Sequence, residues 1–184
     1  LTGLGFDETV TFSFARTAHA DLFIPRGLEV ASVDDERRGD EPALRPSGMI
    51  GLLGCRRANQ AARSAAPGRV RLFEITAVFA QEPAAEGAQP RSVERQNLCM
   101  LMDAPGAAES TKRSADDVQR GLRLMRGAID TIVRSMHGAD ARVVVEPATD
   151  PGIKGWDDSA VAGVSVALPG GGEPFRLGLF GLIS

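Results

Sequence analysis

The order of strand-like and helix-like segments constrains the fold of this chain more than any other feature. β-branched and aromatic residues favour strands at residues 7–14 and 69–81, and a third strand is expected at 94–103. No helical pattern separates the last two of these segments, so they predict a long hairpin. Because parallel strands need a long, usually helical crossover, this order predicts an α+β fold with a mainly antiparallel sheet.

Two segments are predicted to form helices that flank this sheet. Ser114 and Asp117 match the S-x-x-D capping box, and apolar residues then recur at helical spacing, which predicts a helix over 115–137. Pro46 suits the first turn of another helix, which we expect over 46–65. Three further strands are expected at 142–146, 161–168 and 175–183.

Composition and charge narrow the class of protein. The chain has 184 residues, of which 43% are hydrophobic and 24% charged, so we expect residues 1–184 to form a single globular domain. The longest apolar run, residues 48–55, is far shorter than the ~20 residues that span a bilayer, and no membrane segment is expected. A net charge of −3 with 5% aromatic residues disfavours direct binding of nucleic acid.

Neither a metal site nor a disulfide is expected. The two cysteines, Cys55 and Cys99, and the two histidines, His19 and His137, are far apart in the sequence and show no metal-ligand spacing. Unpaired cysteines are typical of a reducing compartment, and we expect a cytoplasmic protein. The chain begins at Leu1 without a signal-peptide pattern, so we expect a fragment of a longer protein.

The first half of the helix expected over 46–65 is rich in glycine. Gly48, Gly51 and Gly54 recur along it, and each glycine in a helix interior destabilises the helix by about 1 kcal/mol relative to alanine. Such a ridge favours the close approach of another backbone, while a weak helix without a partner is the alternative. These glycines and Leu52 are therefore candidate interface residues.

Three blocks of sequence follow one another in an order that is typical of one family. They are residues 3–14 (GLGFDETVTFSF), 44–47 (LRPS) and 70–79 (VRLFEITAVF). In this order they resemble the catalytic-like module of the β subunit of bacterial phenylalanyl-tRNA synthetase. The third block is the most specific, because the family pattern is similar to R-L-F-E-I-G-R-V-F, with Thr76 and Ala77 here in place of Gly-Arg. The resemblance implies a class II aminoacyl-tRNA synthetase-like fold.

The resemblance also implies that the catalytic positions are degenerate. In active class II enzymes the first block looks like motif 1, which ends in Thr-Pro, and the third looks like motif 2, which supplies an arginine. Here Phe12 replaces the proline and Ala80 replaces the arginine. Strand alternation places Ala80 on one face with Glu74 and Glu82, and Phe79 on the other. We expect that face to carry two carboxylates and no cation, so it repels a triphosphate unless Mg²⁺ intervenes.

The function that the resemblance implies is architectural. In this family the α subunit activates phenylalanine with ATP and magnesium, and an α₂β₂ heterotetramer charges tRNA(Phe). This non-catalytic domain is expected to bind no cofactor itself and to pack against α through its motif 1-like region, with Phe12 in the candidate interface. Two alternatives stay open. A regulatory or ligand-binding protein on this fold would bind phenylalanine or ATP in calorimetry, and an independent adenylating enzyme would need an arginine from outside this sequence.

Overall fold

The computed structural model has an α+β fold whose strands form three small sheets. It describes residues 1–33, 38–62, 68–84, 87–104, 114–148 and 152–183. The first sheet joins β1 (Asp7–Glu8), β4 (Arg71–Glu82) and β5 (Arg91–Met102), and the second joins β2 (Phe14–Ala15) and β3 (Ala43–Leu44). The third joins β6 (Arg142–Pro147), β7 (Trp156–Ala167) and β8 (Phe175–Ile183). Pairing within these sheets is antiparallel except between β1 and β4.

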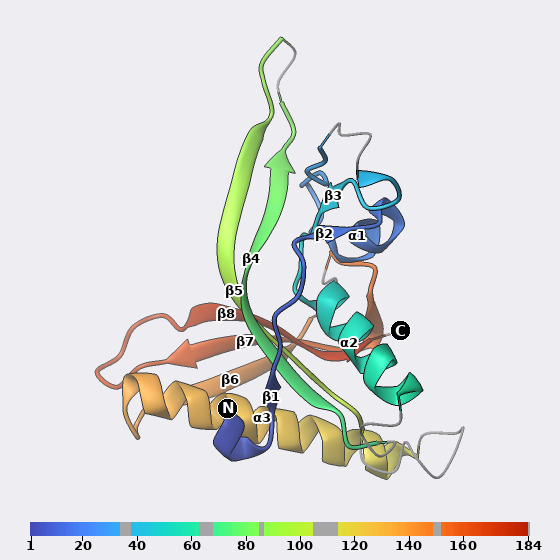
Figure 1. Cartoon of the computed structure of the whole chain (residues 1–184). Helices are drawn as coiled ribbons and strands as arrows, with labels where there is room; N and C mark the ends of the chain where they lie inside the picture. The colour runs from blue at the N-terminus through green and yellow to red at the C-terminus, as the bar shows by residue number, and fades with distance from the viewer. Residues whose placement is uncertain (34–37, 63–67, 85–86, 105–113, 149–151, 184) are drawn as a thin grey trace.

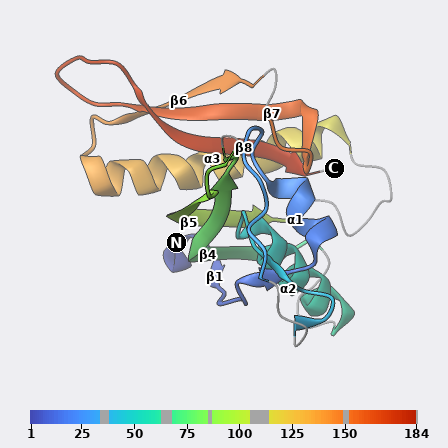
Figure 2. The same ribbon diagram turned by 90° about the horizontal axis from the view of Figure 1, so that it is seen from above.

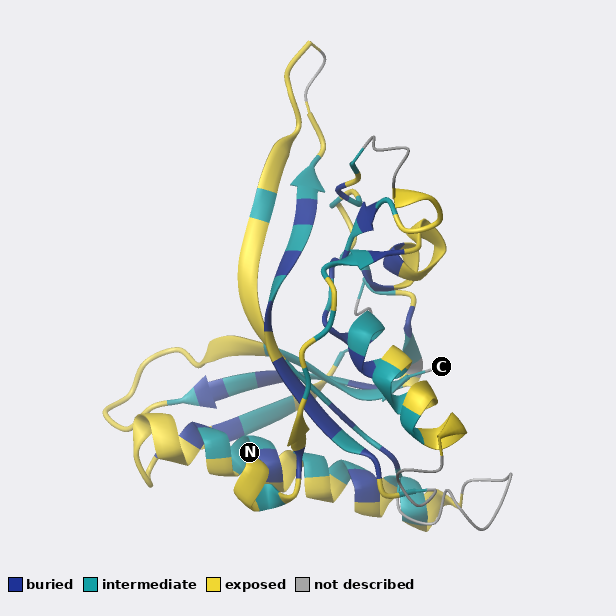
Figure 3. Ribbon diagram, viewed as in Figure 1, coloured by how far each residue is buried: buried dark blue, intermediate teal, exposed yellow. Residues whose placement is uncertain are grey.

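The long hairpin of β4 and β5 dominates the first sheet (Figure 1). The sequence predicts this hairpin; its two strands pair in unbroken register over 12 residues each, with β5 beginning at Arg91 rather than at residue 94. The helix α2 (Met49–Ala61) covers the face formed by even-numbered β4 residues, and α3 (Ala115–His137) covers the opposite face near the base of the hairpin. The first part of β5, residues 91–98, is mostly exposed (Figure 3). The hairpin therefore positions most of the residues discussed below.

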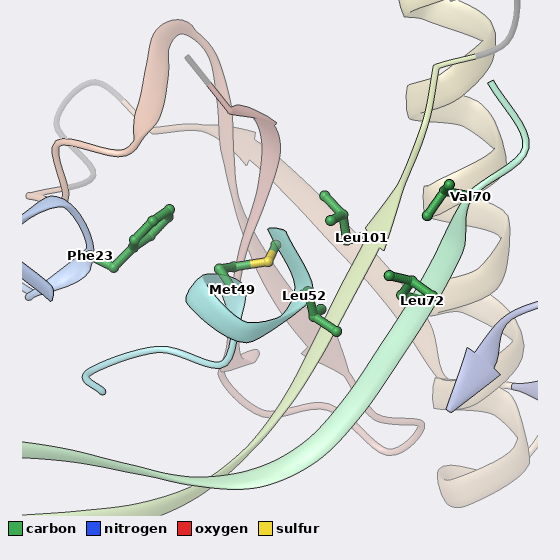
Figure 4. Close-up of a cluster of buried hydrophobic side chains, with 6 residues drawn as sticks. All are labelled: Phe23, Met49, Leu52, Val70, Leu72 and Leu101. Atoms are coloured by element: carbon green, nitrogen blue, oxygen red, sulfur yellow. The ribbon is translucent and has the colours of Figure 1, made fainter. Parts of the chain in front are cut away.

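The first core cluster fills the space between α2 and the hairpin. Its buried side chains, shown in Figure 4, come from α1 (Thr17–Phe23), from α2, from the hairpin and from the residue just before β4: Phe23, Met49, Leu52, Leu72, Leu101 and Val70. Leu52 is fully buried there. Burying a leucine of this kind contributes about 1.5–3 kcal/mol to folding.

Helix α3 joins the first sheet to the third. Ala128 packs against Phe6 and Phe73 of the first sheet region, while Val133 packs against Val143 and its neighbours in the third. Figure 2 shows the helix lying along the sheet of β6, β7 and β8. The amide of Asp117 donates to the hydroxyl of Ser114 at 3.1 Å, which confirms the predicted capping residue and the bounds 115–137. In the described part of the chain, no helix is both long and apolar enough to cross a membrane.

The strand expected over 7–14 is interrupted in the structure. Only its two ends pair as β1 and β2, while residues 9–13 run beside β4 without entering a ladder. The cause is a side chain, because the amide of Thr11 donates to Oε1 of Glu74 at 3.1 Å in place of a strand carbonyl. The segment therefore remains beside β4, but it is held by the side chain of Glu74 at Thr11 and by single backbone hydrogen bonds at Thr9 and Ser13.

The other boundaries differ by a few residues. Helix α2 begins at Met49 rather than at Pro46, with the hydroxyl of Ser47 accepting from the amide of Met49 at 3.2 Å. Of the helix expected over 46–65, residues 63–65 lie outside the described residues. The three C-terminal strands are confirmed, although β7 begins at Trp156 rather than at residue 161.

Candidate functional site

The motif 2-like positions all lie on β4. Glu74 and Ala80 are buried, and Phe79 and Glu82 are half-buried. As strand alternation predicts, Glu74, Ala80 and Glu82 share one face, and Phe79 lies on the other. We call the face of Glu74 and Ala80 the even face, since it consists of the even-numbered β4 residues.

The structure corrects the expectation that the even face carries no cation. Arg45, from the connection between β3 and α2, lies against Glu74, with Nη1 3.1 Å from Oε1. Both side chains are only 3% exposed. In addition, Arg91 and Arg95 of β5 lie opposite even-numbered β4 residues and so point to the same side. None of these arginines is on β4, so the alternation along that one strand could not reveal them.

Arg45 and Glu74 form the centre of a buried network with two threonines. Glu74 accepts from the amide of Thr11 at 3.1 Å and from its hydroxyl at 2.8 Å. Arg45 donates to the hydroxyl of Thr11 at 2.5 Å, to the hydroxyl of Thr76, and to the carbonyl of Ala77 at 3.3 Å. The guanidinium is thus engaged within the chain and almost inaccessible. It forms a structural ion pair, and it is not placed to bind a phosphate.

Two of the three glycines, Gly48 just before α2 and Gly51 within it, face other segments of this chain. A Cβ at Gly51 would lie 2.0 Å from Oγ1 of Thr11, and a Cβ at Gly48 would lie 2.9 Å from Sγ of Cys99. The glycines do permit close approach, but to residues of the same chain. Gly54 has open space beside it.

Leu52 of α2, another candidate interface residue, lies inside the domain. It is fully buried in the first core cluster, so the structure corrects the expectation that Leu52 is an interface residue. The helical period identifies the apolar side of α2, but it does not say whether the chain itself covers that side.

Four large apolar side chains are exposed beside β4. Val10 and Phe12 are 93% and 90% exposed, and Ile75 and Leu98 are 64% and 42% exposed. Ile75 lies directly opposite Leu98 in the hairpin. Thr11 points toward the even face, so alternation along the extended segment places Val10 and Phe12 on the other side, together with Ile75 and Leu98. We call these four residues the apolar patch.

A comparison with known protein families shows to which family this chain belongs. A family model described as the phenylalanyl tRNA synthetase beta chain CLM domain matches residues 1–168. The chain belongs to this family. A search of curated proteins finds no match. The family confirms the resemblance to phenylalanyl-tRNA synthetase β subunits and supports a role in phenylalanine-tRNA ligase, and thus in protein biosynthesis.

The cysteines of this β-chain domain are poor nucleophiles. Burial raises the pKa of the Cys99 thiol, and burial followed by the negative charge of Glu74 raises the pKa of Cys55. A raised pKa leaves little thiolate at neutral pH, and the thiolate is the reactive form. Among the residues described, no group of three or more His, Cys, Asp or Glu side chains could hold a metal ion.

A large cavity of this β-chain domain is mainly apolar. It has a volume of about 800 Å³ and lies between β5, β8 and α3, with Met, Leu and Ile side chains forming much of its lining. The arginine in its described lining, Arg56, is ion-paired with Asp103 at 2.5 Å. The described lining is therefore mainly apolar, and its arginine is already paired within the chain.

Proposed function

We propose that this domain is a non-catalytic, architectural part of phenylalanine-tRNA ligase, with a class II synthetase-like core, that docks against the α subunit of the heterotetramer. The apolar patch is the observation that carries the proposal. Val10 and Phe12 are almost fully exposed, and Ile75 and Leu98 lie on the same side of the hairpin. Contiguous exposed apolar side chains typically mark a protein interface. The patch also includes the motif 1-like segment, which the family resemblance links to α.

The chemistry of the even face supports a non-catalytic role. Ala80 stands where the family resemblance expects an arginine, and Arg45, which shares this face, is buried in an ion pair with Glu74. Loss of one preorganised donor to a developing charge lowers a rate by about 10²–10³-fold. We therefore assign ATP and magnesium to the α subunit, and we assign the charging of tRNA(Phe) to the assembled enzyme.

The isolated domain is expected to catalyse no phenylalanine-dependent exchange of pyrophosphate into ATP. The reason is that Ala80 cannot contact the α-phosphate and that Arg45 is inaccessible. Labelled pyrophosphate measures the exchange, and the assembled α₂β₂ enzyme is the positive control. Exchange above a mock-purified sample would contradict the non-catalytic assignment.

Phe12→Ser in the full β chain is expected to weaken association with the α subunit about tenfold or more. Phe12 is 90% exposed, so its loss should change the stability of the domain little. The dissociation constant can be measured by sedimentation of the purified subunits. Met136→Ser is the matched control, because Met136 is 72% exposed on α3 outside the apolar patch. Equal affinity of the two variants would place the interface elsewhere.

A further inference from the structure

We infer that the network of Arg45, Glu74 and Thr11 positions the docking edge, by which we mean residues 9–13, so that Val10 and Phe12 face the partner. This inference rests on the proposed docking of the α subunit. It gives the buried network of the even face a role in assembly, and it makes Arg45, Glu74 and Thr11 positioning residues. They act through the exposed neighbours of Thr11.

The docking edge is fastened at every second residue. At one end, the amide of Thr9 donates to the carbonyl of Phe73 at 2.9 Å. At the other end, the carbonyl of Ser13 accepts from the amide of Arg45 at 2.8 Å. Thr11 lies between these two contacts and is held by the buried network. Alternate fastening of this kind presents the intervening side chains outward.

Thr11 is held from two sides at once. Glu74 accepts from its amide at 3.1 Å and its hydroxyl at 2.8 Å, and Arg45 donates to the same hydroxyl at 2.5 Å. The side chain also lies so close to α2 that a Cβ at Gly51 would meet its Oγ1 at 2.0 Å. With Thr11 directed inward, alternation directs Val10 and Phe12 outward.

Such positioning matters for affinity because the docking edge is outside the ladder of β4. A segment that becomes ordered only on binding reduces affinity by the conformational entropy that it loses, whereas a preorganised segment does not. The hydroxyl of Thr11 joins both charged groups to the edge, and its removal should therefore loosen Val10 and Phe12 without altering either side chain.

The test compares two substitutions of Thr11 in the full β chain. Thr11→Val keeps the shape and removes the hydroxyl, and we expect about tenfold weaker binding of α and faster amide exchange at Val10 and Phe12 in free β. Thr11→Ser keeps the hydroxyl and should bind α within about threefold of the wild type. The matched control is Thr131→Val, which removes an exposed hydroxyl that donates to Gly127 of α3, and it should change neither measurement.

The outcomes separate this inference from the proposed function. If Phe12→Ser weakens binding but Thr11→Val does not, only the positioning role is overturned. If Thr11→Val and Thr11→Ser weaken the binding of α equally, the positioning role is also overturned, because loss of the hydroxyl is then not the cause of the weaker binding. If Phe12→Ser leaves binding unchanged, docking through the apolar patch is wrong, and the positioning role falls with it. Amide exchange at Val10 still reports whether the network orders the edge.

Discussion

Leu52→Asp is expected to leave the domain unfolded without denaturant. Leu52 is fully buried among Met49, Leu72 and Leu101, and removing a leucine from such a core costs about 2–5 kcal/mol. A carboxylate without a partner at the same place adds a further penalty of several kcal/mol. The total approaches the whole stability of a typical domain, about 5–15 kcal/mol. Circular dichroism during heating measures the loss of the folded state.

A smaller substitution makes this prediction quantitative. Leu52→Ala should lower the free energy of unfolding by about 2–5 kcal/mol. Leu124→Ala is the matched control, because Leu124 is also helical but 42% exposed, and its effect should be below about 1 kcal/mol. A thermal midpoint of Leu52→Asp close to that of the wild type would contradict the placement of Leu52 in the core and would favour a place in the interface with α.

Glu74→Ala should lower the free energy of unfolding by about 3–5 kcal/mol, because it leaves the buried guanidinium of Arg45 without its counter-ion. Thr11 loses its acceptor at the same time. Urea denaturation measures the change. Glu82→Ala is the matched control on the same face, since its pair with Arg91 is exposed and 3.6 Å long, and it should cost below about 1 kcal/mol.

The double variant Arg45→Met, Glu74→Met separates the unpaired charge from the loss of packing. Replacing both members of a buried ion pair by apolar side chains is often neutral. We therefore expect the double variant to be more stable than Glu74→Ala. A loss below about 1 kcal/mol for Glu74→Ala would show that this ion pair is not needed for the fold.

The sequence predicts those helices and strands whose residue pattern continues over many consecutive positions. The capping residue Ser114 and the helical period are sufficient for α3, and the two strand-like segments around the turn are sufficient for the hairpin of β4 and β5. The helical period extends over 23 residues in α3, and residues typical of strands extend over most of β4 and β5, so neither prediction depends on a single position.

Short helices and strands are not predicted from the sequence, because contacts with distant segments determine whether they form. In the seven-residue α1, only Ala20 and Phe23 are buried, which is too few positions to establish a period. Strand β3 has two residues, and it exists because Ala43 and Leu44 pair with β2. The interruption of the strand expected over 7–14 has the same kind of cause, since it depends on a side chain of β4 that is distant in sequence.

The candidate site was predictable in part. Alternation along β4 assigns Glu74 and Ala80 to one face, as the structure shows. The same alternation describes a single strand, so it cannot say that Arg45 from another segment lies on that face. The glycines of α2 likewise indicate close packing, while the identity of the neighbour, Thr11 at Gly51, is known only from the structure.

Amide hydrogen exchange of the full β chain, with and without the α subunit, tests the proposed docking most directly. We expect binding of α to slow exchange at residues 9–13 and near Ile75 and Leu98, because these residues contain or border the apolar patch. The exposed side of α3 near Met136 should exchange equally fast in both states. Protection confined to α3 or β8, with residues 9–13 unchanged, would contradict docking through this patch.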